Sequence, residues 1–134
     1  MKITVETVVN APVEKIWAAY IDPKAIEQWN TASADWQTVN ATLDFKVGGN
    51  FSYRMEAKDG SMGFDFAGVY THIVPHKEIA FRFGDREAKV EFIQGEKGVA
   101  VRQEFDPDDQ YPLEHQKNGW QSILDNFARF VEAK

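Results

Sequence analysis

Polar side chains on otherwise apolar faces are the chemically most informative feature of this 134-residue sequence. Gln103 interrupts an alternating apolar strand pattern, Gln116 interrupts the apolar stripe of a C-terminal helix, and Tyr53 carries its hydroxyl on the inner face of a strand. Burying such a group without a partner costs roughly 1–3 kcal/mol. We therefore predict that each one either orients an oxygen atom of a bound ligand or bonds another of these groups or a buried water.

Residues suited to catalysis or metal binding do not form a recognisable constellation. The sequence has no cysteine, which excludes disulfides, thiolate nucleophiles and zinc–thiolate sites. His72 and His76 straddle a proline and His115 is expected on the outer side of the last helix, so neither a metal site nor a cofactor is predicted. Ser61 lacks the G-x-S-x-G frame of a nucleophile elbow, and Gly48-Gly49 lacks the helix and lysine of a phosphate-binding loop. No catalytic residue is predicted.

Aromatic residues are abundant, with ten Phe, four Trp and four Tyr. Each buries a large apolar area, and apolar pockets with few polar groups are typical small-molecule sites. We therefore predict a ligand pocket, although the same residues could instead interlock as a filled core. The predicted lining is Phe51, Tyr53, Phe64, Phe66, Phe81, Phe83, Phe92, Gln103, Phe105, Gln116, Trp120, Leu124 and Phe127. Trp29 and Trp36 bracket a loop near the expected mouth, where they could gate access or pack against the long helix.

The longest helical pattern runs from Tyr111 to Val131. Its apolar residues recur at the i, i+3, i+4, i+7 spacing of one buried stripe centred on Trp120. Gly119 inside this helix costs about 1 kcal/mol relative to Ala, which suggests that another element approaches it closely. We expect Trp120, Leu124 and Phe127 to form the floor of the pocket.

Before this helix the sequence predicts mostly strands. Residues 2–9 alternate as a first strand, and two short helices follow at Pro12 and Pro23, with Asp22 as the N-cap of the second. Alternating segments then span residues 36–39, 51–56, 63–73, 79–83, 87–92 and 99–105. Turn-length connections favour an antiparallel meander, and Gly68 indicates a bulge or bend. The predicted architecture is α+β, with one curved sheet around the C-terminal helix.

Composition and charge place the chain among ordinary globular proteins. Residues 1–134 are expected to form one domain, with 43% hydrophobic and 27% charged residues. A net charge of −6 and the absence of a basic run argue against nucleic-acid and membrane-surface partners. The longest apolar run is far too short to span a bilayer, and the N-terminus has no signal core. A cytoplasmic protein is expected.

Several short motifs, in order along the whole chain, resemble the START-like (SRPBCC) superfamily. Within it the sequence is similar to the family of activator of heat-shock-protein-90 ATPase homologues. The motifs are Ala11-Pro12 with Ile16-Trp17, Asp22-Pro23, Trp29, Gly48-Gly49 before Phe51, Asp59-Gly60, Gly68-Val69-Tyr70, Ile73-Val74-Pro75, and Gly119-Trp120 followed by Ile123 to Phe127. The segment after Pro75 departs from the family pattern, which often has an Arg-Leu pair leading into Thr-Trp.

The resemblance implies a helix-grip (START-like or Bet v-like) fold with a cavity between sheet and helix that often holds apolar molecules. Together with the inward aromatic residues, it favours a non-enzymatic domain that binds a lipid-like or aromatic small molecule. A polyketide cyclase or dehydratase-like enzyme is an alternative, and it would require a titratable group with a perturbed pKa in the pocket. A stress-related co-chaperone that binds a chaperone through its surface is another, and it would require an exposed apolar patch and a closed interior.

Overall fold

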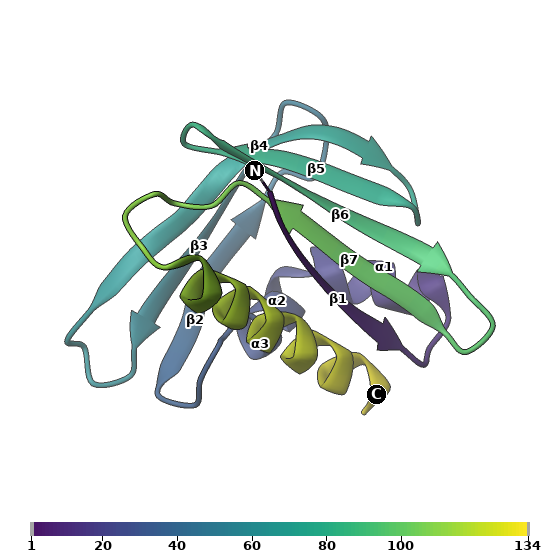
Figure 1. Cartoon of the computed structure of the whole chain (residues 1–134), viewed down its shortest axis with the longest axis horizontal. Coiled ribbons are helices and arrows are strands. Elements are labelled where there is room, and N and C mark those ends of the chain that lie inside the picture. The colour runs from purple at the N-terminus through teal and green to yellow at the C-terminus, as the bar shows by residue number, and fades with distance from the viewer. Residues whose placement is uncertain (1, 134) are drawn as a thin grey trace.

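Seven antiparallel strands form one curved sheet, and a long C-terminal helix lies across it (Figure 1). The structure is a computed structural model that describes residues 2–133. The elements are β1 (Ile3–Val9), α1 (Val13–Ile21), α2 (Pro23–Trp29), β2 (Trp36–Leu43), β3 (Asn50–Ala57), β4 (Gly63–Val74), β5 (Glu78–Phe83), β6 (Arg86–Gln94), β7 (Val99–Phe105) and α3 (Leu113–Glu132). The predicted α+β helix-grip architecture, with two short helices between the first two strands, is confirmed.

The strand order is β1-β7-β6-β5-β4-β3-β2, so β2 to β7 form a meander and β1 closes onto the last strand. Val5 pairs with Gln103 and Ile3 with Phe105. Along β7 every second residue is fully buried, which is the alternation expected of a sheet covered on one face. This alternation turns Gln103 toward the interior, as its position in the sequence predicts.

Strand β2 extends four residues beyond its predicted end, to Leu43. A register shift between Val39 and Thr42 interrupts its pairing with β3, and Asn40 between them has a positive φ of 53°. This bulge breaks the period-two pattern, which explains why the sequence signal is weak there. In β4 the irregularity lies between Tyr70 and His72 rather than at Gly68, which pairs regularly with Phe51.

The break between α1 and α2 occurs at Asp22-Pro23, as predicted. Pro23 occupies the first helical position of α2, where its missing N–H leaves no bond unmade. The Asp22 carboxylate accepts a hydrogen bond from the Lys24 backbone N–H at 3.3 Å, so Asp22 is the N-cap.

We expect Asp22→Ala to lower the free energy of unfolding by about 1 kcal/mol, because it leaves an N-terminal N–H of α2 without its side-chain acceptor. Urea denaturation followed by circular dichroism measures the change. Asp22→Asn keeps an acceptor oxygen at the same position and is the control. A loss in Asp22→Asn as large as that in Asp22→Ala would contradict the capping role.

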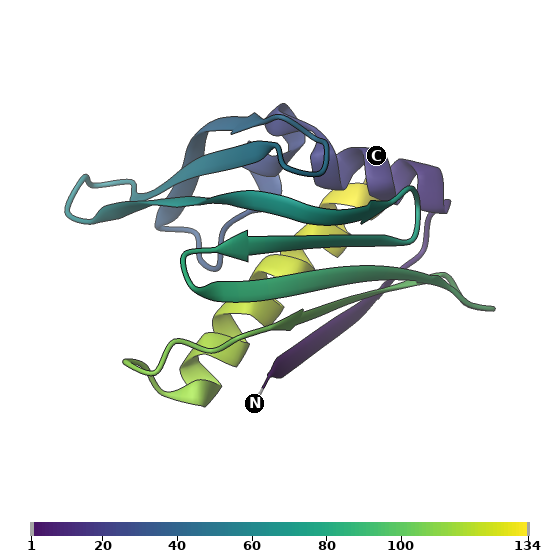
Figure 2. The ribbon, with the colours of Figure 1, turned by 90° about the horizontal axis from the view of Figure 1, so that it is seen from above.

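Helix α3 crosses the strands obliquely, as the view from above shows (Figure 2). Its C-terminal half buries Leu124, Phe127, Ala128 and Val131. Its first turn is exposed. Within residues 2–133, none of the helices combines the length and apolar character needed to cross a bilayer.

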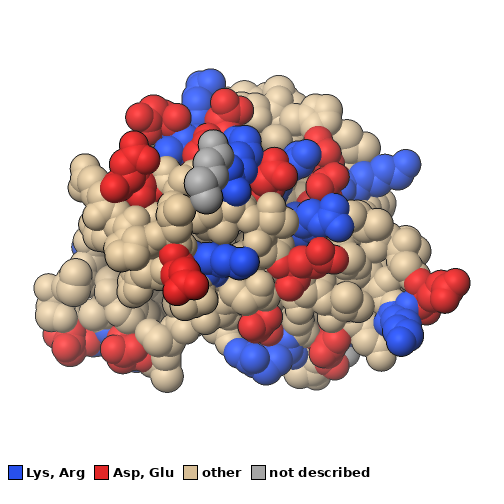
Figure 3. All heavy atoms as spheres, viewed as in Figure 1, with Lys and Arg blue, Asp and Glu red and all other residues tan. Residues whose placement is uncertain are grey.

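Charged side chains are scattered over the face of the molecule seen in Figure 3. On the face seen in Figure 3, Lys and Arg side chains are interspersed with Asp and Glu rather than gathered into one basic area. Such a surface lacks the concentrated positive charge that holds a nucleic-acid backbone.

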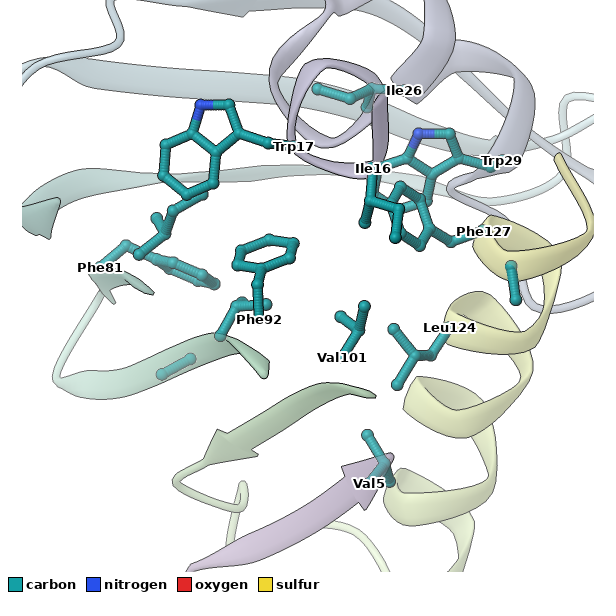
Figure 4. Close-up of a cluster of buried hydrophobic side chains, with 14 of the residues drawn as sticks. Val5, Ile16, Trp17, Ile26, Trp29, Phe81, Phe92, Val101, Leu124 and Phe127 are labelled. Carbon is teal, nitrogen blue, oxygen red and sulfur yellow. The ribbon is translucent and has the colours of Figure 1, made fainter. Parts of the chain in front are cut away.

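Buried apolar side chains lie where the C-terminal half of α3 meets α1, α2 and the sheet (Figure 4). Leu124 points toward Val101, and both are fully buried. The Phe127 ring centroid lies 4.8 Å from that of Trp29 and 5.3 Å from that of Tyr20. The interior beneath this half of the helix is therefore filled by side chains.

Candidate functional site

A pocket of about 340 Å³ lies between the sheet and the N-terminal half of α3. This volume is at the lower end of the range of about 300–1,000 Å³ found for small-molecule sites, and equals the liquid volume of roughly ten waters. Seven aromatic residues of β3, β4 and β5 form one wall, and all of them except Tyr70 were predicted: Phe51, Tyr53, Phe64, Phe66, Phe81 and Phe83. Phe64 is 48% exposed, so the pocket reaches the surface there.

Four other predicted residues also line the pocket: Trp29, Gln103, Gln116 and Trp120. The Trp120 ring stacks on Phe105 with a centroid distance of 3.8 Å and an interplanar angle of 8°. The Trp29 indole N–H donates to the Ala19 carbonyl at 3.1 Å. This bond and the contact with Phe127 of α3 hold Trp29 in the core. Trp29 thus packs against the long helix, which was one of the two roles considered for it.

The structure places the five remaining predicted residues outside the pocket lining. Phe105 lies behind the Trp120 ring, and Phe92 packs between Trp17 and Tyr20. Trp36 lies on the edge strand β2, and its ring contacts that of Phe64 on β4. Leu124 and Phe127 belong to the filled half of the core, so the prediction that they form the pocket floor with Trp120 is wrong. The physical reason is that this half of the helix packs directly against other elements.

The deepest polar contact of the pocket joins Gln103 to Tyr20. The Gln103 side-chain amide N–H donates to the Tyr20 hydroxyl oxygen at 2.8 Å. Gln103 is only 5% exposed, and its Oε1 atom accepts no hydrogen bond from the described residues. The pair therefore presents a buried acceptor, Oε1, and the hydroxyl hydrogen of Tyr20 as a donor.

Two further hydroxyl groups, those of Tyr53 and Tyr70, interact with each other inside the pocket. Burial raises the pKa of Tyr70 to about 12 and raises the pKa of Tyr53 well above its ordinary value. Burial also raises the pKa of Tyr20, and the bond from Gln103 opposes this only in part. All three phenols therefore keep their protons near neutral pH and act as hydrogen-bonding groups.

Gln116 holds the loop before α3 in place. Its Oε1 accepts from the Asp108 backbone N–H at 2.7 Å, and its Nε2 donates to the carbonyls of Asp108 and Tyr111 at 2.8 and 2.9 Å. The amide thus already has protein partners at both ends. Gln116 therefore bonds backbone groups, rather than another inward polar side chain or a buried water as predicted from the sequence.

Arg86 brings a positive charge to the pocket lining. Its Nε–H donates to the Asp106 carbonyl at 3.0 Å, and its guanidinium carbon lies 4.6 Å from the centroid of the Phe83 ring. Among residues 2–133 the guanidinium forms no ion pair, and no Asp or Glu lines the pocket. His115 is exposed, as predicted, but it also borders the pocket, which was not predicted. Residues 115, 116, 119, 120 and 123 of the helix all contribute to the lining.

Gly119 adjoins the pocket and not a neighbouring element. A Cβ atom built at this position has nothing within 4 Å. The prediction that another element approaches Gly119 closely is therefore wrong. The missing side chain instead leaves space in the pocket wall.

The sequence reasoning missed several lining residues, among them Tyr20, Tyr70, Asn30 and Arg86. Tyr20 lies on the apolar face of α1, where its ring suggests only core packing. The inward alternation of Ala88, Val90 and Phe92 extends back to Arg86, so the sequence pattern could have placed Arg86 on the inner face. Among residues 2–133, no group of three or more His, Cys, Asp or Glu side chains could hold a metal ion.

Comparisons with known proteins agree with this architecture over nearly the whole chain. A family model described as Activator of Hsp90 ATPase homolog 1-like protein matches residues 10–132. The solution structure of the AHSA1-like protein from Aeromonas hydrophila is 42% identical, with a TM-score of 0.93 over 99% of this chain and 93% of that chain. A Cytophaga hutchinsonii protein is 40% identical, with a TM-score of 0.85 over 98% and 92%. A Chromobacterium violaceum protein is 26% identical, with a TM-score of 0.86 over 98% of both chains. No curated protein matches the sequence.

Proposed function

The chain belongs to the family of Activator of Hsp90 ATPase homolog 1-like proteins, and from this premise we propose that it binds a small, largely apolar molecule in the pocket beneath α3. The observation that carries the proposal is the pocket itself, about 340 Å³ between the aromatic wall of β3–β5 and the first half of α3. A mostly apolar lining with a few convergent polar groups is what small-molecule sites typically have. The fold is consistent with such a role.

Binding without catalysis is favoured by the chemistry of the lining. No carboxylate lines the pocket, and burial raises the pKa of Tyr20, Tyr53 and Tyr70. Near neutral pH these protonated phenols are poor general bases, because a base must be deprotonated to accept a proton. His115 is the remaining lining side chain that could accept a proton, and it lies exposed in the first turn of α3 and not inside the pocket. A cyclase or dehydratase mechanism that begins with proton abstraction therefore has weaker support than binding.

A surface-binding co-chaperone also has weaker support. That alternative requires a closed interior together with an exposed apolar patch, whereas here the interior holds a pocket. The exposed large hydrophobic side chains of the described residues are Val8, Val47, Met62, Phe64, Ile93, Tyr111 and Leu113. Of these, Phe64 lines the pocket and contacts Trp36. Its exposure is therefore accounted for by a ligand site.

Substitutions at Gly119 test the proposal because this residue lines the pocket and a Cβ atom there has nothing within 4 Å. The probes are 4-propylphenol, 1-naphthol and 1-octanol, followed by NMR chemical-shift perturbation. We expect at least one of them to shift signals of Trp120 and Tyr53, and Gly119→Leu to weaken that binding at least tenfold by filling the space.

Gly119→Ala is the matched control. It adds one methyl group, and we expect it to raise the free energy of unfolding by about 0.5–1 kcal/mol, because Ala is the better helix former. Its effect on binding should be much smaller than that of Gly119→Leu. A folded Gly119→Leu protein that binds the probes as tightly as the parent would refute the proposed site, as would a parent protein that binds none of them.

A further inference from the structure

Two polar features of the pocket, the Tyr20–Gln103 pair and Arg86, lie apart from each other and differ in charge. From this we infer that the ligand is a hydroxylated carboxylic acid with an apolar body, whose hydroxyl meets the Tyr20–Gln103 pair and whose carboxylate meets Arg86. The inference rests on the proposed function and specifies the chemical class of the ligand.

At the inner end, the Tyr20–Gln103 pair requires a partner that both donates and accepts. Gln103 Oε1 is buried without a donor, and the Tyr20 oxygen already accepts from Gln103 at 2.8 Å, which leaves its own hydrogen free. One hydroxyl group can donate to Oε1 and accept from Tyr20. A neutral group fits better than a charged one here, because a buried ion without a counter-charge carries a large desolvation cost.

At the outer end, Arg86 is the group that requires an anion. The Asp106 backbone carbonyl accepts a hydrogen bond only from the Nε–H of Arg86. The Asp106 carboxylate instead accepts hydrogen bonds from Lys2 Nζ at 2.8 Å and from the Glu87 backbone N–H at 2.9 Å. The remaining guanidinium N–H groups are therefore free of a carboxylate partner within the described chain. A planar guanidinium matches a carboxylate with two parallel hydrogen bonds.

The sheet register fixes the separation of the two ends. Gln103 pairs with Val90, and Arg86 lies four residues from Val90 on the same strand. At about 3.3 Å per residue, the two backbone positions are roughly 13 Å apart along β6. Phe81 and Phe83 line the pocket from the neighbouring strand, so an apolar body can lie between the polar ends.

The test uses isothermal titration calorimetry with three matched probes: 5-(4-hydroxyphenyl)pentanoic acid, the same acid without its phenolic hydroxyl, and the corresponding alcohol without the carboxylate. We expect the hydroxy acid to bind about tenfold more tightly than the alcohol and at least fivefold more tightly than the deoxy acid. The alcohol loses one charge-assisted contact relative to the hydroxy acid, and the deoxy acid loses one neutral hydrogen bond.

Variants assign each contact to its residue. Arg86→Met should remove the preference for acid over alcohol, whereas Arg82→Met, at an exposed position on β5, should leave it unchanged. Gln103→Met should remove the preference for the phenol over the deoxy acid. If Gln103→Met fails to fold, Tyr20→Phe tests the same contact, because it deletes only the hydroxyl.

The outcomes distinguish this inference from the proposed function. Equal binding of all three probes, or an Arg86→Met protein that still prefers the acid, would overturn the assigned ligand class while leaving apolar binding intact. Failure of all three probes, together with failure of the neutral probes used for the Gly119 variants, would overturn both. Two results together would establish the inference. Only Arg86→Met should remove the preference for the acid over the alcohol, and only the change at Gln103 or Tyr20 should remove the preference for the phenol over the deoxy acid.

Discussion

Gly68→Ala is expected to lower the free energy of unfolding by about 3 kcal/mol, at the upper end of the cost of overpacking a core. A Cβ at this position would lie 2.3 Å from the backbone carbonyl oxygen of Arg82 and 2.8 Å from the ring of Phe51. Neither neighbour can move easily, because the carbonyl belongs to β5 and Phe51 is buried among Tyr53, Phe66 and other rings. The midpoint of thermal unfolding should fall by roughly 10 °C.

Gly119→Ala is the control for this substitution, because it makes the same chemical change where no atom lies within 4 Å. Thermal and urea unfolding of the two variants should therefore change in opposite directions. If Gly68→Ala were as stable as the parent, β4 and β5 would have to separate at this point without cost. That result would contradict the close packing of the aromatic wall that borders the pocket.

The fold could be predicted from the sequence because its elements repeat simple periods. The two-residue alternation of β7 and the apolar stripe of α3 each arise from one face that is buried and one that is not. Asp22-Pro23 marked a helix boundary through local chemistry alone. The bulge in β2 was missed, since an extra residue changes the side-chain phase and thereby removes the pattern on which a strand prediction depends.

The candidate site was predictable only in part. Hydrophobic periodicity places Phe51, Leu124 and Phe127 equally on inner faces, but only Phe51 lines the pocket. The difference depends on how closely α3 approaches the sheet along its length, and this is a tertiary property. The Tyr20–Gln103 bond joins residues 83 positions apart, so nothing local in the sequence specified it.

Helix α3 thus serves two purposes along its length. Its second half contributes Leu124, Phe127 and Val131 to a filled core and supplies packing energy. Its first half contributes Gly119, which has no side chain, and Gln116, whose amide is bound to the preceding loop. The pocket lies beside the half of the helix where side chains occupy less space. The packing contacts that are missing there are offset by the filled core beneath the other half.

The pocket's phenols lead to a second large expected effect, a steep loss of stability at alkaline pH. Burial raises the folded-state pKa of Tyr70 to about 12 and raises those of Tyr20 and Tyr53 above the ordinary value of about 10. The unfolded chain therefore releases these protons first. Their contribution to stability is fully present below about pH 10 and is lost as the pH rises toward the folded-state values.

Each such tyrosine should lower the free energy of unfolding by about 1.4 kcal/mol per pH unit above pH 10, so the three together should give a slope of about 4 kcal/mol per unit. Urea denaturation between about pH 8 and pH 11.5, combined with near-ultraviolet absorbance of phenolate, measures both the slope and the proton release. Tyr20→Phe and Tyr70→Phe should each reduce this dependence of the unfolding free energy on pH by about one third.

Slopes unchanged by either substitution would mean that the phenols ionise as easily in the folded protein as in the unfolded chain. Water would then have free access to the hydroxyls of Tyr20 and Tyr70, and the low-dielectric character on which both the proposed binding and the ligand class depend would be lost. A reduced slope in both variants would instead place the phenols in a low-dielectric pocket. In such a pocket the hydrogen bonds offered by Tyr20 and Gln103 discriminate between ligands more strongly than they would in water.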